Sequence, residues 1–437
     1  SLFMSLQFIT GNSGNGKTKY LFNRIVKEAK ANPRDNYLVI VPEQFTMQTQ
    51  RQLVDLSENK AIMNIDVLSF KRLAYRVFDE LGITNLTVLE ETGKNLVLRK
   101  LAAQEADKLG VIGRNLNRIG YISEVKSLLS ELVQYNISPE ELGRYIASGR
   151  LSDTLSDKLK DVLVLYEAFE KFMQDKYITA EEILNVLCNV AEESAILRNS
   201  VIAFDEFTGF TPIQNQLIKK LFVISKKIYV TLTIDCREDI FKSRGMQELF
   251  DMPKRTVKSL TEMAAFYGIE VEEPIILDKN YRLAENEELS FMEQQLFRKR
   301  RCSFKKVPKH IHIDCLRDPK QELTKIARRI NELVRNENLR YRDIAIVTGD
   351  VNIYAGYVRE IFDKYNIPYF IDATQEILFH PFIEFIRSIP DIAAQNFSAD
   401  AVFRFLRCGF SELLDSEIDV LENYVLACGV RGKSAWD

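Results

Sequence analysis

The first 81 residues alternate between short, mostly apolar runs and longer stretches in which apolar side chains recur at helical spacing. The runs at 6–10, 37–42 and 65–68 have the composition of strands buried on both faces of a parallel sheet. Helices are expected after the first and third runs, at 19–30 and 70–81. This order predicts an α/β domain built on a parallel sheet.

Residues 89–190 break the alternation, because strand signals almost disappear while apolar residues keep a helical period. Leu128, Leu129, Leu132 and Tyr135 form one such series. This stretch is therefore expected to be a helical insertion. Strand-like runs return at 201–205 and 227–234, which indicates that the α/β domain resumes after the insertion.

A basic segment at 298–309 is the best candidate for a domain boundary. Beyond it the pattern predicts a second α/β unit, followed by helices from about residue 380. The strands of this second unit are expected at 310–315, 343–348 and 369–371, and its helices at about 320–336 and 354–365.

Composition limits the class of protein. Hydrophobic residues make up 46% and charged residues 28%, as in soluble globular proteins, and no apolar run is long enough to span a membrane. The formal charge of −3 argues against a polycation that coats nucleic acid, so any DNA contact must be local. The six cysteines include no C-x-x-C pair and are expected to be reduced thiols of a cytoplasmic protein.

The chain carries a complete G-x-x-x-x-G-K-T loop between the first expected strand and helix. Such a loop turns successive N–H groups towards phosphate oxygens, and the helix N-terminus adds partial positive charge. Lys17 is expected to reach the β- and γ-phosphates and the Thr18 hydroxyl to hold Mg²⁺. The alternative is an ordinary glycine-rich turn. The predicted ATP-binding residues are Gly11, Asn12, Ser13, Gly14, Asn15, Gly16, Lys17 and Thr18.

Asp205 and Glu206 end the strand expected at 201–205. In ATPases with this loop, such an Asp shares Mg²⁺ with the loop hydroxyl, and a following Glu polarises the attacking water. Lys17, Asp205 and Glu206 are thus the candidate catalytic residues, and Thr18 and Asp205 the candidate Mg²⁺ ligands. Acids that merely end a strand at solvent are the alternative. Arg282 is a further candidate for a γ-phosphate contact.

Polar and aromatic side chains follow the second and third expected strands, at 42–46 and 69–75. Open α/β sheets bind ligands at the carboxyl ends of their strands, and this mixture of side chains suits single-stranded nucleic acid. The alternative for 69–75 is an ordinary helix start with Phe70 and Leu73 in the core. Spacing alone does not separate the two.

In this order the motifs resemble the plan of UvrD-like superfamily 1 helicases. Residues 11–18 resemble the first motif, Asp205-Glu206-Phe207 the start of D-E-x-Q-D, and Asn280-Tyr281-Arg282 the Q-N-Y-R motif. The resemblance implies two RecA-like ATP-binding domains with parallel sheets and large helical insertions. The implied boundaries are 4–88 with 199–297 for the first domain, 89–198 for its insertion, 298–380 for the start of the second domain and 381–437 for the start of the second insertion.

A more specific resemblance is to the AddB family, carried by residues 11–18, 41–46, 67–75, 367–372 and 380–387. It implies a subunit that works with AddA in an ATP-dependent helicase–nuclease, which processes double-strand breaks for homologous recombination. Single-stranded and duplex DNA are the implied partners, and the nuclease and its iron–sulfur cluster are expected beyond residue 437. The positions that match the family's site for scanning a Chi-like recombination hotspot are Gln44, Thr46, Phe70, Arg72, Tyr75 and Phe207. Tyr75 stands where most family members have Trp.

Departures from active superfamily 1 motors bear on activity. Thr208-Gly209 replaces the usual Gln-Asp, and Glu238 replaces the Gln that senses phosphate. A carboxylate at that place is expected to repel transition-state charge, which predicts nucleotide binding with weak or no motor activity. The intact Asp205-Glu206 pair keeps the alternative open, which is an active UvrD-type helicase motor.

Overall fold

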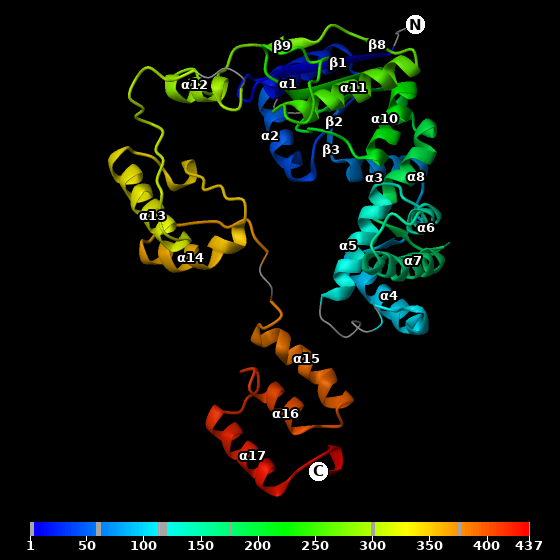
Figure 1. Ribbon diagram of the computed structural model, residues 1–437, viewed down its shortest axis with the longest axis vertical. Helices are drawn as coiled ribbons and strands as arrows, with labels where there is room; N and C mark the ends of the chain where they lie inside the picture. The colour runs from blue at the N-terminus through cyan, green and yellow to red at the C-terminus, as the bar shows by residue number, and fades with distance from the viewer. Residues whose placement is uncertain are drawn as a thin grey trace. The chain divides into compact units, whose positions relative to one another are not determined.

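The computed structural model describes residues 4–57, 63–111, 113, 120–174, 176–298, 302–374 and 377–436. The chain forms two compact units, unit 1 up to residue 311 and unit 2 from residue 312 onward (Figure 1). Among the described residues, no helix is both long enough and apolar enough to cross a lipid bilayer.

Unit 1 is built on a sheet in which every strand pair is parallel, as the sequence predicts. The strand order is β3–β2–β6–β7–β1–β8, and β9 also pairs with β1. The strands are β1 (Ser5–Gly11), β2 (Asn36–Ile40), β3 (Ile65–Leu68), β6 (Ser200–Phe204), β7 (Lys227–Thr233), β8 (Glu270–Val271) and β9 (Ile275–Leu277). Because the strands are parallel, their carboxyl ends all lie at one edge of the sheet.

Helices cover both faces of this sheet, which explains why its strands are mostly apolar (Figure 1). Within β1, Leu6 and Phe8 pack on one face and Ile9 packs on the other. The Ile9 face is covered by α1 (Lys17–Ala31) and α2 (Thr46–Leu56). The opposite face is covered by α3 (Phe70–Leu81), α8 (Ile183–Val190), α10 (Pro212–Ile224) and α11 (Asp251–Phe266).

The expected helical insertion is present and has a core of its own. Its helices are α4 (Glu91–Gln104), α5 (Tyr121–Gln134), α6 (Pro139–Ala147) and α7 (Asp153–Met173). A two-stranded parallel ladder of β4 (Val88–Leu89) and β5 (Ile178–Thr179) accompanies them, although the sequence shows almost no strand signal there. Ile183 and Leu187 of α8 pack into the core of the sheet rather than into that of the insertion.

Short helices complete unit 1. They are α9 (Ala195–Arg198) and α12 (Glu287–Gln295). The 3₁₀ turns described in the whole chain are η1 (Glu43–Phe45), η2 (Ala106–Lys108), η4 (Ala191–Glu193), η5 (Tyr341–Asp343) and η6 (Lys433–Ala435).

Unit 2 has the predicted helices but not the predicted strands. Its helices are α13 (Pro319–Asn336), α14 (Val351–Lys364), α15 (Pro381–Ala394), α16 (Ala399–Leu406) and α17 (Asp415–Cys428). The strands expected at 310–315, 343–348 and 369–371 are wrong, because no described residue there belongs to a ladder. Val347 is 93% exposed and Phe370 is 89% exposed, so these segments lack the neighbours that a strand requires. A second parallel sheet is therefore not formed by the described residues.

Candidate functional site

The glycine-rich loop (residues 11–18) joins β1 to α1 at the carboxyl edge of the sheet. Gly14 and Gly16 have φ values of 90° and 81°, in the left-handed region that glycine adopts without strain. Gly16 is the N-cap of α1 and has no side chain to bond the first-turn N–H groups. The amides at this helix end therefore remain available to an anion.

The segment that follows β9 lies directly against the glycine-rich loop. The Tyr281 N–H donates to Gly14 O at 3.0 Å, Asn280 Nδ2 to Ser13 O at 2.9 Å, and Arg282 Nη1 to Ser13 Oγ at 3.1 Å. A Cβ on Gly14 would lie 2.8 Å from Asn280 Oδ1 and 2.9 Å from Arg282 Cβ. Gly14 is therefore needed for this close approach, which brings Arg282 to the loop.

A cavity of about 840 Å³ brings the predicted catalytic residues together. It is lined by Lys17 and Thr18 from the loop, Asp205 and Glu206 from the end of β6, and Arg282. Lys17 Nζ donates to Asn12 O at 3.1 Å. Burial lowers the pKa of Lys17, although the charges of Asp205 and Glu206 oppose that shift.

Asp205 is the buried carboxylate of the cavity and is only 2% exposed. Thr18 Oγ1 donates to its Oδ2 at 2.9 Å, and Thr231 of β7 donates to its Oδ1. Burial raises the pKa of Asp205, and these two hydrogen bonds work against the shift. A hydroxyl and a carboxylate in contact are hard oxygen donors that suit Mg²⁺.

Glu206 follows with φ +66°, a left-handed conformation that is uncommon outside glycine. Its carboxyl lies at the cavity, beside Asp205. Local strain of this kind is typical of functional sites, where the surrounding fold holds a side chain in a particular direction.

Other lining residues were not predicted from the sequence. Tyr281 lines the cavity, and a Cβ on Gly16 would lie 3.6 Å from its ring. Its place between Asn280 and Arg282 was the available signal. Thr231 and Gln52 also line the cavity, but a threonine in a strand and a glutamine on a helix carry no signal of their own.

The residues predicted to contact DNA follow β2, β3 and β6, which are neighbouring strands. Gln44 and Arg72 are exposed, and Tyr75 is 38% exposed. Arg72 Nε donates to Glu43 Oε1 at 2.8 Å. Hydrogen bonds from Ser69 and Arg72 lower the pKa of Glu43, so this carboxylate remains ionised beside the guanidinium.

Two other predicted DNA contacts are buried. Thr46 is 6% exposed, and its hydroxyl donates to Glu43 O. Phe70 is 7% exposed and packs on Phe204, Phe207 and Phe210, as the alternative hypothesis of an ordinary helix start predicts. Phe207 is half-buried over this cluster.

The fold and the site together define a class, that of parallel α/β proteins with a glycine-rich loop at the start of the first helix. Within that class the chain belongs to the AddB family, since residues 8–293 match the family model described as "ADDB, N-terminal".

Curated relatives cover nearly all of this chain. Proteins named as subunits of an "ATP-dependent helicase/deoxyribonuclease" from Lachnoclostridium phytofermentans, Clostridium tetani and Clostridioides difficile are 39%, 34% and 33% identical to it. The matches include 99%, 98% and 99% of this chain. The chain spans 38% of the length of each of these relatives.

Proposed function

We propose that this chain is the nucleotide- and DNA-binding part of a subunit of an ATP-dependent helicase–nuclease that processes DNA double-strand breaks for homologous recombination. The family membership and the names of the relatives support the class of enzyme. The same proposal has four further parts. They are AddA as the partner subunit, a cytoplasmic location, a second RecA-like domain that begins in unit 2, and an iron–sulfur nuclease outside this chain.

One observation carries the nucleotide part of the proposal, namely the convergence of Lys17, Thr18 and Asp205 on one cavity beside an uncapped helix start. Lys17 would exchange its bond with Asn12 O for phosphate oxygens. Thr18 and Asp205 would hold Mg²⁺, which neutralises phosphate charge. Arg282 would approach the terminal phosphate from the segment after β9.

Weak or absent motor activity is supported by the position of Glu238. Its carboxylate pairs with Lys254 at 2.6 Å, and it is not among the described residues that line the cavity. In place of the repulsion expected from the sequence, the structure offers a positional reason, since this side chain binds a buried ammonium instead of facing the nucleotide.

An active UvrD-type motor remains the second candidate, and the geometry of Asp205 and Glu206 favours it. Both carboxylates lie at the cavity, and Glu206 has the conformational strain described above. A water between Glu206 and a terminal phosphate would be placed for attack.

Measurement of ATP binding by the full-length protein, with Mg²⁺ and with EDTA, tests the proposal. We expect Lys17→Ala to weaken binding roughly ten- to hundredfold, the worth of one charge-assisted contact to phosphate. Lys27→Ala, an exposed lysine on the same helix, is the matched control and should bind as wild type does. Equal affinity of wild type and Lys17→Ala would reject the proposal.

ATP turnover with single-stranded DNA separates the two candidate functions. The scanning subunit is expected to show little DNA-stimulated turnover of its own. Strong turnover that Lys17→Ala abolishes would establish the motor instead.

A further inference from the structure

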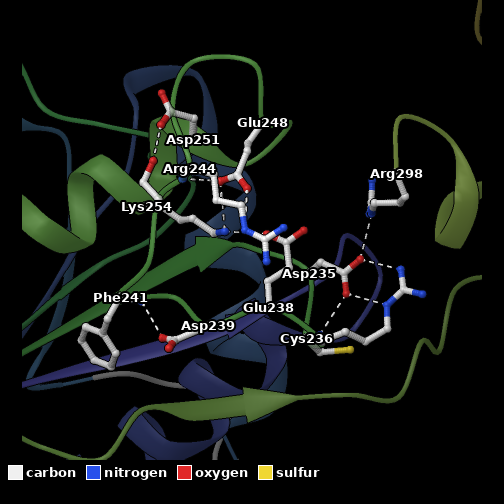
Figure 2. Close-up of polar contacts among 12 residues, drawn as sticks. Asp235, Cys236, Glu238, Asp239, Phe241, Arg244, Glu248, Asp251, Lys254 and Arg298 are labelled. Atoms are coloured by element: carbon white, nitrogen blue, oxygen red, sulfur yellow. Dashed lines mark hydrogen bonds and ion pairs between the residues drawn. The ribbon is translucent and has the colours of Figure 1, made fainter. Parts of the chain in front are cut away.

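Two buried charged side chains of unit 1 are not among the described residues that line the nucleotide cavity. Asp235, just after β7, is 1% exposed, and Lys254 of α11 is 4% exposed. Both bind residues of the loop after β7 (residues 234–250), as Figure 2 shows. Burial of a charge is costly unless each partner is placed well, so these contacts fix geometry.

Asp235 joins the loop after β7 to Arg298, which lies three residues beyond the end of α12. The Arg237 guanidinium donates to it at 2.9 and 2.6 Å, and the Arg237 N–H donates at 3.0 Å. Arg298 Nε donates to it at 2.9 Å (Figure 2). Burial alone would raise the pKa of Asp235, but these guanidinium groups outweigh it and hold the pKa well below its usual value. The Arg298 guanidinium also lies 4.7 Å from the centre of the Phe250 ring.

Lys254 fixes the remainder of this loop. Its ammonium lies 2.6 Å from Glu238 and 3.4 Å from Glu248 (Figure 2). The loop is therefore tied to α11 at one place and to Arg298 at another, and the Cys236 N–H between these ties has a defined position.

Asn12 connects this fixed loop to the nucleotide site. Its Oδ1 accepts from the Cys236 N–H at 2.9 Å, and its Nδ2 donates to Glu293 of α12 at 2.8 Å. Its carbonyl accepts from Lys17 Nζ. Glu293 is in turn 3.7 Å from Arg298. A continuous chain of polar contacts thus runs from the lysine of the glycine-rich loop through α12 to Arg298, just after that helix.

We infer that Asn12, Glu293 and Arg298 are positioning residues that transmit the nucleotide state of the glycine-rich loop to α12, from which the chain continues into unit 2. The inference rests on the proposed nucleotide binding, because Lys17 must leave Asn12 O to reach a phosphate. When Lys17 leaves, the Asn12 carbonyl loses its hydrogen bond. The position of Asn12 then changes, and with it the contacts that its side chain makes to Cys236 and to Glu293 of α12.

The test is hydrogen exchange of backbone amides at 287–298 in the full-length protein, with and without Mg²⁺ and a non-hydrolysable ATP analogue. In wild type we expect the analogue to change exchange rates in α12 about threefold or more. Arg298→Met should keep analogue affinity within about twofold and lose this response. Arg237 still pairs with Asp235 in that variant, so the buried charge remains compensated.

Glu293→Ala is the second variant, since it removes the acceptor for Asn12, and the same loss is expected. Lys306→Met is the matched control, because Lys306 pairs with Glu287 of the same helix but lies outside the chain of contacts. It should respond as wild type does. A wild-type response in both Arg298→Met and Glu293→Ala, or no response in a wild-type protein that binds the analogue, would overturn the inference alone. Failure of wild type to bind the analogue would overturn the proposed function as well.

Discussion

At the scale of single residues, the structure gives several motif positions a second role in the fold. Asn280, from the segment that resembles Q-N-Y-R, donates to the main chain of the glycine-rich loop at Ser13 O. Thr46 bonds to Glu43 O, and Phe70 fills the core. A match to a motif identifies a position, but burial and hydrogen bonding decide which atoms of that residue can reach a ligand.

Gly14→Ala is expected to weaken nucleotide binding at least about tenfold. An added Cβ would meet Asn280 and Arg282 within 3 Å and would strain a backbone at φ +90°. Gly149→Ala is the control, since its φ is +68° and nothing lies within 4 Å of an added Cβ. Titration of a fluorescent ATP analogue into both variants measures the difference. Equal affinities would show that the contact with Asn280 and Arg282 does not shape the site.

At the scale of elements, sequence patterns predicted β1, β2, β3, β6 and β7 and the helices α1 and α3 with close boundaries, but gave no bounds for α2, α10 or α11. Continuous apolar runs mark strands covered on both faces, and amphipathic helices such as α3 carry a strong periodic signal. The ladder of β4 and β5 was missed, because two residues per strand are too few for a pattern. The strands expected in unit 2 failed for a different reason. Apolar composition gives a tendency to extend, but only a paired neighbour makes a strand.

Contacts between charged groups of distant elements had no sequence signal at all. Lys254 lies on a helix with an amphipathic pattern, and nothing in its neighbours indicates that its ammonium is buried against Glu238 and Glu248. The same holds for Lys94 of α4, which is 3% exposed and pairs with Glu181 at 2.7 Å. Such pairs depend on tertiary packing and become visible only in the structure.

Lys94→Ala is expected to destabilise unit 1 by about 2–4 kcal/mol, because it leaves Glu181 partly buried without its cation. Glu91 also loses a contact, at 3.1 Å. Lys160→Ala breaks an exposed pair with Asp157 on α7 and should change stability by less than about 0.5 kcal/mol. Urea unfolding of the full-length proteins, followed by circular dichroism, gives both values. Similar small losses in the two variants would contradict a structural role for Lys94.

At the scale of the whole molecule, the parallel sheet gathers both proposed binding functions at one edge. The glycine-rich loop follows β1, while the candidate DNA residues follow β2, β3 and β6. The sequence could predict this edge, because carboxyl ends of parallel strands meet there. The sequence could not predict which of these side chains remain exposed. In the structure Gln44, Arg72 and Tyr75 are exposed and Phe207 is half-buried.

Arg72→Ala in the full-length protein is expected to weaken single-stranded DNA binding and to reduce its salt dependence by about one counterion. Tyr75→Ala is expected to cost roughly 1–3 kcal/mol of stacking with no change in salt dependence. Arg150→Ala, an exposed arginine between α6 and α7, is the control for charge. Fluorescence anisotropy with a labelled oligonucleotide at several salt concentrations measures all three. Unchanged binding in Arg72→Ala and Tyr75→Ala would reject this face as the DNA site.

Asp205, Glu206 and Phe207 occupy consecutive positions in one sharp bend of the backbone. Asp205, proposed to bind Mg²⁺, and Phe207, proposed to contact DNA bases, are thus separated by a single residue of the main chain. The left-handed conformation of Glu206 fixes the directions of both neighbours relative to each other. A substitution that changes the backbone at Glu206 is therefore expected to affect the proposed metal contact and the proposed base contact together.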